Sequence, residues 1–200
     1  MLYLLTGEIQ TGKTRWLERV TGELAAAGVP VAGVVAPGVW RIAEDGFYEK
    51  LGIDNVLLPG GERVHLACRH DLALAAGMLE ARGQSERAGL RWAMSDAALE
   101  QVDVHVGRVA RDSRGVAALR PGLLVIDELG RLELMRGEGL QRAAAAVAAG
   151  PTQAWPHMLV VVRASLLPLA HERFDAAWNG AVREIGPTDQ ARAELLARYC

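Results

Sequence analysis

Residues 1–14 read MLYLLTGEIQTGKT, and this stretch contains the most specific motif of the chain. Its first part, Met1 to Thr6, is a short apolar run that predicts a buried β-strand. Its second part, Gly7 to Thr14, matches the pattern G-x-x-x-x-G-K-[S/T] at every fixed position. Apolar residues then recur at helical spacing and predict a helix over 14–27. A strand, a glycine-containing loop and a helix in this order predict a phosphate-binding loop.

The fixed positions of this loop, the Walker A motif, have chemical reasons. Backbone N–H groups of the loop wrap phosphate oxygens, and the start of the next helix adds a favourable dipole. Lys13 places a positive charge near the β- and γ-phosphates, and the Thr14 hydroxyl suits Mg²⁺. Lysine is rare in this chain, because only Lys13 and Lys50 occur. The predicted nucleotide-binding residues are Gly7, Glu8, Ile9, Gln10, Thr11, Gly12, Lys13, Thr14 and Arg15.

A second motif combines a buried strand with two acids. Leu123 to Ile126 is fully apolar, and Asp127 and Glu128 follow it directly. Parallel strands deliver their C-terminal residues to one ligand-binding edge, where the phosphate-binding loop also lies. Asp127 is therefore expected to serve Mg²⁺, as in a Walker B motif, and Glu128 to orient and deprotonate the attacking water. The alternative is an ordinary acidic turn after a strand.

Apolar strands alternate with helices over most of the chain, which predicts an α/β fold: a P-loop NTPase with a mostly parallel sheet and helices on both faces. Residues 38–70 differ, because short strand-like pieces near 47–52, 54–58 and 63–68 predict a small β-hairpin insertion. We expect one domain over residues 1–200. Further expected elements are a strand at 30–36, a weak helix at 71–82, a polar loop at 83–86, helices at 95–112, 137–149 and 166–178, strands at 158–162 and 181–185, and a closing helix to residue 199.

Composition limits the classes of function. The formal net charge is −2 and the sequence pI about 6.2, so no nucleic-acid or membrane-surface partner is expected. No signal peptide, no apolar run long enough to span a membrane and no disulfide framework are recognised, which together favour a cytoplasmic location. Cys68-Arg69-His70 contains two possible metal ligands, but a buried apolar cysteine is the preferred interpretation.

With both motifs identified, the chain resembles the THEP1-like nucleoside-triphosphatases. The specific signal is Asp127 to Leu134, DELGRLEL, which is similar to that family's D-E-hydrophobic-G-x-M-E-L signature with Leu132 in place of methionine. Weaker similarities lie at Gly33 to Pro37 with Gly46-Phe47, Arg91-Trp92, Val162-Arg163 and Val182 to Leu195.

The resemblance implies an Mg²⁺-dependent phosphatase of ATP, GTP and related nucleotides with a RecA-like P-loop core. It carries the phosphate-binding role onto Gly7 to Thr14 and the metal and base roles onto Asp127 and Glu128. It also suggests Arg163, which follows a strand, as an arginine finger in cis. The chain departs from the family inside the loop, where Ile9-Gln10 replaces the usual Pro-Gly.

Other residues have two interpretations each. Arg108, Arg111 and Arg114 form either a lid over the phosphates or a solvated helix end. Glu133 is either a site carboxylate or a capping one, and Arg131 is a weaker finger candidate than Arg163. The tryptophans are packing residues, unless Trp40 or Trp92 stacks on a nucleobase. The histidines are expected to be structural or on the surface, because none has recognisable catalytic or metal-ligand spacing.

Three functions are compatible with these motifs. The first is a nucleoside triphosphatase that uses Lys13, Glu128 and Arg163 with Mg²⁺. The second is a small-molecule kinase whose acceptor binds to the 38–70 insertion. The third is a nucleotide-dependent switch that serves a partner protein. The Asp127-Glu128 pair favours the first, and the absence of an N-K-x-D motif argues against guanine recognition of the small-G-protein type.

Overall fold

The computed structural model describes residues 1–8, 10–75, 83–84, 92–111 and 120–199. The described strands are β1 (Leu2–Leu5), β2 (Val31–Val35), β3 (Gly38–Ile42), β4 (Tyr48–Leu58), β5 (Glu62–Arg69), β6 (Trp92–Met94), β7 (Leu123–Ile126), β8 (His157–Val161) and β9 (Val182–Ile185). The described α-helices are α1 (Lys13–Ala26), α2 (His70–Ala75), α4 (Asp96–Arg111), α5 (Gln141–Ala148), α6 (Leu167–Phe174) and α7 (Asp189–Leu196). The π-helix η2 (Leu132–Arg136) and the 3₁₀-helices η3 (Ala164–Leu166) and η4 (Asp175–Trp178) complete them.

The core of the sheet is parallel, as the apolar strands predict. Along the described strands the order is β6-β5-β4-β2-β7-β8-β1-β9, and β3 pairs with β4. The five strands from β2 to β9 in this order run parallel to one another. Their carboxyl ends therefore lie at one edge of the sheet, so the segments that follow β1, β7 and β8 meet there.

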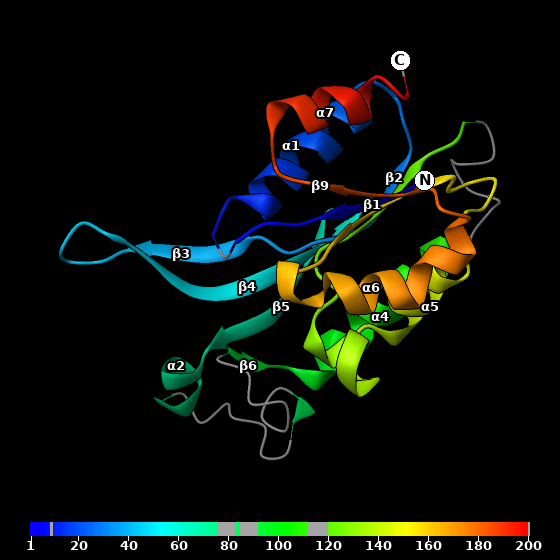
Figure 1. Ribbon diagram of the computed structural model, residues 1–200. Helices are drawn as coiled ribbons and strands as arrows, with labels where there is room; N and C mark the ends of the chain where they lie inside the picture. The colour runs from blue at the N-terminus through cyan, green and yellow to red at the C-terminus, as the bar shows by residue number, and fades with distance from the viewer. Residues whose placement is uncertain (9, 76–82, 85–91, 112–119, 200) are drawn as a thin grey trace.

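Helices cover both faces of this core (Figure 1). Helices α1 and α7 lie on one face, and α4, α5 and α6 lie on the other. Successive strand residues point to opposite faces, so Leu4 packs in one apolar cluster and Leu5 in the other. All four residues of β1 and of β7 are buried, which explains why both strands are continuous apolar runs.

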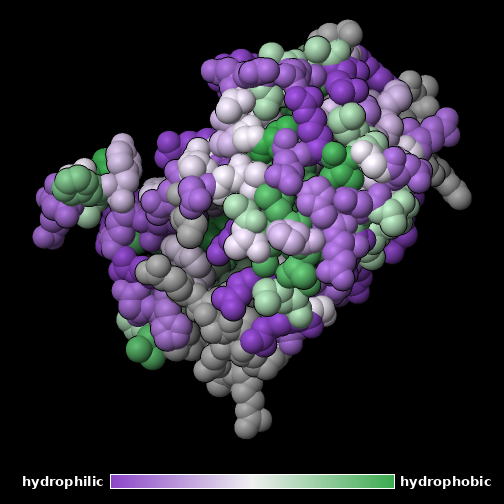
Figure 2. Space-filling model, in the orientation of Figure 1, coloured by the Kyte–Doolittle hydropathy of each residue, from purple (hydrophilic) through white to green (hydrophobic). Residues whose placement is uncertain are grey.

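The predicted insertion is present, and its strands continue the core sheet. β4 pairs antiparallel with β2 through Val56 to Leu58, and farther along it pairs with β3 and β5. The β3–β4 hairpin projects from the body in Figure 1, and Figure 2 shows apolar residues at its tip. Phe47 and Tyr48 at this tip are 74% and 75% exposed.

Several boundaries differ from the sequence-based expectation. The pieces expected near 47–52 and 54–58 form one strand, β4. Its pairing with β5 shifts register between Ile53 and Asp54 and continues on both sides of that shift. The short strands β3 and β6 were not predicted, since neither is a buried apolar run. The helix expected at 137–149 begins only at Gln141, because Gly137 and Gly139 have left-handed φ values of 67° and 71°.

Two other helical predictions changed in part. The segment 166–178 contains a central α-helix between two 3₁₀-helices, and the weak helix expected at 71–82 is seen as α2, with 76–82 outside the described residues. Of the loop expected at 83–86, residues 85 and 86 also lie outside them. Side-chain N-caps begin two of the helices: the Ser95 hydroxyl accepts from the N–H of Ala98 before α4, and the Thr188 hydroxyl accepts from that of Ala191 before α7.

Candidate active site

The phosphate-binding loop connects β1 to α1 at the carboxyl edge of the sheet. Gly12 has a left-handed φ of 85° directly before α1 begins at Lys13. Gln10 also has a positive φ, 64°, which is uncommon for a residue with a side chain. Ile9, a predicted binding residue, lies outside the described residues. The loop thus has the left-handed turns and helix start that expose backbone N–H groups to an anion.

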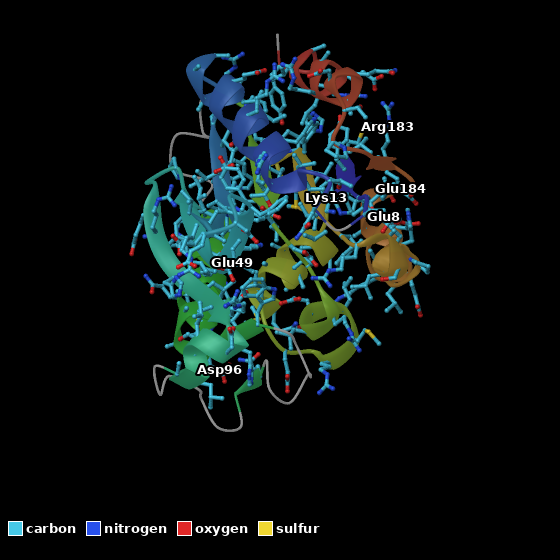
Figure 3. All side chains as sticks on the ribbon, turned by 90° about the vertical axis from the view of Figure 1, so that its left-hand side faces the viewer. Glu8, Lys13, Glu49, Asp96, Arg183 and Glu184 are labelled. Atoms are coloured by element: carbon cyan, nitrogen blue, oxygen red, sulfur yellow. The ribbon has the colours of Figure 1, made fainter. Side chains whose placement is uncertain are left out.

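Lys13 folds back over its own loop. Its Nζ donates to the carbonyl oxygens of Gly7 and Glu8, at 2.8 and 2.7 Å. Figure 3, in which this edge faces the viewer, shows Lys13 at the start of α1 and Glu8 beside β9. The ammonium group is therefore held over the loop, where a phosphate oxygen would exchange with a backbone carbonyl as its partner.

Asp127 directly follows β7 and lies near the phosphate-binding loop. The residue is only 6% exposed, and its Oδ2 accepts from the N–H of Ala36 at 3.0 Å. Burial raises the pKa of Asp127 to about 6, although hydrogen bonds from Ala36 and the Thr14 side chain oppose that shift. The predicted metal residues Thr14 and Asp127 thus lie close enough for the Thr14 side chain to lower the pKa of Asp127.

Glu128, which follows β7, forms an ion pair with Arg163, which follows the neighbouring strand β8. Arg163 Nε donates to Glu128 Oε1 at 2.6 Å, and the side chains are 52% and 31% exposed. Arg163 lies two residues after the end of β8, the strand between β7 and β1. The structure therefore brings together Glu128 and Arg163, and it places both at the edge where the phosphate-binding loop lies.

Comparison with known proteins agrees with this arrangement. A family model described as NTPase matches residues 2–170, which is most of the chain. The chain belongs to this NTPase family. The resemblance to the THEP1-like proteins is thereby confirmed.

Two solved structures resemble this NTPase family member. The solution structure of a human cancer-related nucleoside triphosphatase has a TM-score of 0.60 at 21% identity, covering 98% of this chain and 93% of that chain. The crystal structure of THEP1 from the hyperthermophile Aquifex aeolicus has a TM-score of 0.58 at 15% identity, covering 100% of this chain and 97% of that chain. At these identities the likeness confirms the P-loop fold. None of the curated proteins matches the chain.

Glu133 is a capping carboxylate that supports the segment after Asp127. It is 5% exposed, and its two oxygens accept from the N–H groups of Gly130 at 2.7 Å and Leu140 at 2.9 Å. Burial raises the pKa of Glu133, and the two backbone hydrogen bonds oppose that shift. Of the two interpretations of this residue, the structure shows the capping one, which ties the Glu128–Gly130 turn to the start of α5.

Of the three arginines interpreted as either a lid or a solvated helix end, Arg108 does not lie near this edge. Arg108 is on the last turns of α4 beside Val109, whose carbonyl accepts from Trp155 Nε1. Trp155 precedes β8, so this end of α4 lies toward the amino ends of the parallel strands, away from Arg163. Arg108 is also within 3.5 Å of His105. Arg114 lies outside the described residues. The lid interpretation is therefore wrong for Arg108.

Lys50 lies near the candidate site, and the sequence did not single it out for a role there. It lies on β4, yet Asp127, Glu128 and Arg163 all influence its pKa, which burial lowers and the two carboxylates raise. The signal in the sequence was its rarity, as one of only two lysines, next to an inserted hairpin. Recognising it would have required the register of β4 against β3.

The structure also bears on the other metal and surface candidates. Within the described residues no group of three or more His, Cys, Asp or Glu side chains could hold a metal ion by itself. Cys68 is half-buried, and its neighbour Arg69 pairs with Glu49 and Asp71. Across the described ranges no helix is long and apolar enough to cross a membrane.

Proposed function

We propose that this chain is an Mg²⁺-dependent nucleoside triphosphatase that converts ATP or GTP to the diphosphate and inorganic phosphate. The observation that carries the proposal is that the phosphate-binding loop after β1 and Asp127 after β7 lie at the same carboxyl edge of the parallel sheet, close enough for the Thr14 side chain to lower the pKa of Asp127. Thr14 and Asp127 are far apart in sequence, and the parallel sheet joins them at one edge. We further propose that residues 1–200 act as one domain, because the inserted strands continue the core sheet.

Binding is assigned to the loop. Its N–H groups and the start of α1 attract the phosphates, and the proposed contacts are made by Gly7 to Thr14 with Arg15 beside them. Lys13 exchanges its carbonyl partners Gly7 and Glu8 for oxygens of the β- and γ-phosphates. In this exchange the Lys13 ammonium group gives up two neutral carbonyl acceptors for charged phosphate oxygens, which favours the nucleotide-bound form.

The hydrolytic step is assigned to Glu128 and Arg163. Glu128 orients a water molecule and takes its proton as the water oxygen bonds to the γ-phosphorus. The bond from the γ-phosphorus to the bridging oxygen breaks, and the diphosphate leaves. Arg163, already 2.6 Å from Glu128, holds the carboxylate in place and adds positive charge beside the transferring group.

The oxygens present fit magnesium. The Thr14 hydroxyl and the Asp127 carboxylate are hard ligands, and two such ligands together with water and substrate oxygens suit Mg²⁺ better than a dedicated cage would. When bound, the cation neutralises charge on the β- and γ-phosphates. Burial and the hydrogen bond from Ala36 restrain the Asp127 side chain.

The kinase alternative was favoured by an arginine lid over the phosphates. Arg108, one of the three arginines considered for that lid, lies away from the site. The switch alternative requires tight binding with negligible turnover. Base preference between ATP and GTP, a cytoplasmic location and a protein partner stay predictions from the sequence.

The test is phosphate release from ATP and GTP with Mg²⁺ and no acceptor, for the wild type, Lys13→Ala and Glu128→Gln. We expect turnover in the wild type, loss of binding in Lys13→Ala, and loss of turnover with retained binding in Glu128→Gln. A wild type that binds nucleotide and releases no phosphate would overturn the hydrolase proposal. Release that begins only on adding an acceptor would indicate the kinase.

A further inference from the structure

The ammonium group of Lys50 lies near the rings of two tryptophans, at the middle of the β3–β4 ladder. Its Nζ lies 5.9 Å from the ring centroid of Trp40 on β3 and 5.3 Å from that of Trp92 on β6. Trp40 is the direct cross-strand partner of Lys50. Contacts of this kind attract a cation through the ring faces and leave its N–H donors free for oxygen acceptors. The two indoles therefore position the ammonium group without satisfying its hydrogen bonds.

The side chain of Lys50 reaches the backbone segment that holds Asp127. A Cβ atom built on Gly38 would lie 2.8 Å from Lys50 Cε and 2.5 Å from Trp40 Nε1, so the end of the lysine rests against Gly38 itself. Two residues earlier, the N–H of Ala36 donates to Asp127 Oδ2. The lysine thus approaches the carboxyl edge of β7 from the side of the insertion, whereas Lys13 approaches it from the phosphate-binding loop.

The charges around Lys50 are those of the candidate site. Asp127 and Glu128 attract its ammonium group and Arg163 repels it, while burial lowers its pKa. A lysine that only supported the hairpin could turn its charge to water, because long side chains extend to solvent at little cost. A half-buried lysine facing a catalytic carboxylate pair is instead the pattern of a functional cation.

We propose that Lys50 is a further catalytic residue whose ammonium group contacts the γ-phosphate of the bound nucleotide, with Trp40 and Trp92 holding it there. The proposal rests on the proposed function, because it adds a second lysine to the same site. Negative charge in phosphoryl transfer is spread over the γ-phosphate oxygens. A cation held in place before the reaction stabilises that charge without reorganisation. Lys50 therefore contributes to recognition of a triphosphate over a diphosphate as well as to turnover.

The test compares Lys50→Met and Lys50→Gln with the wild type in two measurements. Steady-state phosphate release gives kcat and KM, and titration with ADP and with a non-hydrolysable ATP analogue gives the affinity ratio between triphosphate and diphosphate. Loss of one preorganised charge contact at the reacting group is expected to lower kcat by about 10²-fold. The analogue should bind about tenfold more weakly, with ADP affinity unchanged, because only the analogue carries a γ-phosphate. Lys50→Gln keeps a polar group in the half-buried position in case Lys50→Met does not fold.

Arg41→Gln is the matched control. Arg41 neighbours Trp40 on β3, pairs with Glu49 at 2.6 Å and is 57% exposed, so the change removes one positive charge from the opposite face of the same hairpin. It should leave kcat and the affinity ratio unchanged.

Folded Lys50 variants with wild-type kcat and an unchanged affinity ratio would overturn the assignment, even if their melting temperatures fell. If the wild type releases no phosphate, the proposed function fails, and the affinity ratio still decides the contact between Lys50 and the γ-phosphate.

Discussion

Arg163 Nε and Glu128 Oε1 lie 2.6 Å apart, although 35 residues separate them in the chain. The pair exists because β8 lies between β7 and β1, so the residues after β7 and β8 are neighbours at the carboxyl edge. This geometry places Glu128 beside an arginine of the same chain, as the proposed mechanism requires. The two residues should therefore behave as one unit in kinetic measurements.

A double-mutant cycle tests this coupling. Glu128→Gln and Arg163→Gln are each expected to lower kcat by about 10²-fold or more, and the double variant should lose far less than the product of the two. Arg183 and Glu194 also form a 2.6 Å pair, between β9 and α7, and supply the matched control. Arg183→Gln and Glu194→Gln should leave kcat unchanged. Strictly multiplicative losses at Glu128 and Arg163 would show that the ion pair does not position the carboxylate.

The environment of Asp127 predicts how pH and magnesium affect stability. Its pKa in the folded protein is raised from 3.8 to about 6, so its contribution to stability is fully present below about pH 4 and is lost as the pH rises through 6. Mg²⁺ binds the deprotonated form and should offset that loss, raising the melting temperature at pH 7.5 and not at pH 5. Asp127→Asn should remove the magnesium effect, and Asp45→Asn, at the exposed hairpin tip, should keep it. An equal magnesium shift in Asp127→Asn would exclude this carboxylate as the ligand.

The turn around Glu133 predicts different costs for two alanine substitutions. Gly137 and Gly139 have φ values of 67° and 71°, so alanine at either adds backbone strain of about 1–2 kcal/mol to the free energy of folding. A Cβ atom on Gly137 would meet nothing within 4 Å, whereas one on Gly139 would lie 2.0 Å from Glu133 Oε1. Gly139→Ala must therefore displace a buried carboxylate as well, at a further cost of about 1–3 kcal/mol.

Urea unfolding of Gly137→Ala and Gly139→Ala measures that difference directly. We also expect Gly139→Ala alone to lower kcat, because moving Glu133 removes the acceptor that holds the N–H of Gly130 behind Glu128. Equal stabilities of the two variants would show that Glu133 can move without cost.

Gln10 predicts a local strain within the phosphate-binding loop. Its φ of 64° is left-handed, and this is the position at which the family usually has the glycine of Pro-Gly. Gln10→Val should lower the free energy of unfolding by about 1–2 kcal/mol, because a β-branched side chain fits this region poorly. Gln10→Gly should be neutral or slightly stabilising, since relief of strain opposes the greater freedom of glycine in the unfolded chain. A Gln10→Val variant as stable as the wild type in urea would contradict the strain.

The sequence predicted the parts of the site whose chemistry is local. The loop from Gly7 to Thr14 and the acids after β7 are recognisable because phosphate and metal binding require particular residues at particular spacings. The parallel core followed from continuous apolar strands, and the observed β1, β2, β7, β8 and β9 agree with the expected ones within a residue or two.

What could not be predicted depends on strand order and register. The pairing of Glu128 with Arg163 requires β8 to lie beside β7, which no local pattern specifies. The place of Lys50 depends on its register opposite Trp40 and on β6, a three-residue strand without an apolar pattern. The late start of α5 follows from the left-handed conformations of Gly137 and Gly139, because glycine within a helical pattern does not reveal its φ value.

The length of β4 has an evolutionary consequence. One end of this strand pairs with β2, and its other end pairs with β3 and continues to an exposed tip, with Lys50 two residues from its start at Tyr48. Residues added or removed in matched pairs beyond Trp40 and Lys50 would preserve the side-chain alternation of both strands, because that alternation has a period of two. Descendants of this protein could therefore vary the length and chemistry of the tip freely, while Lys50 stays opposite Trp40 and in register with the core.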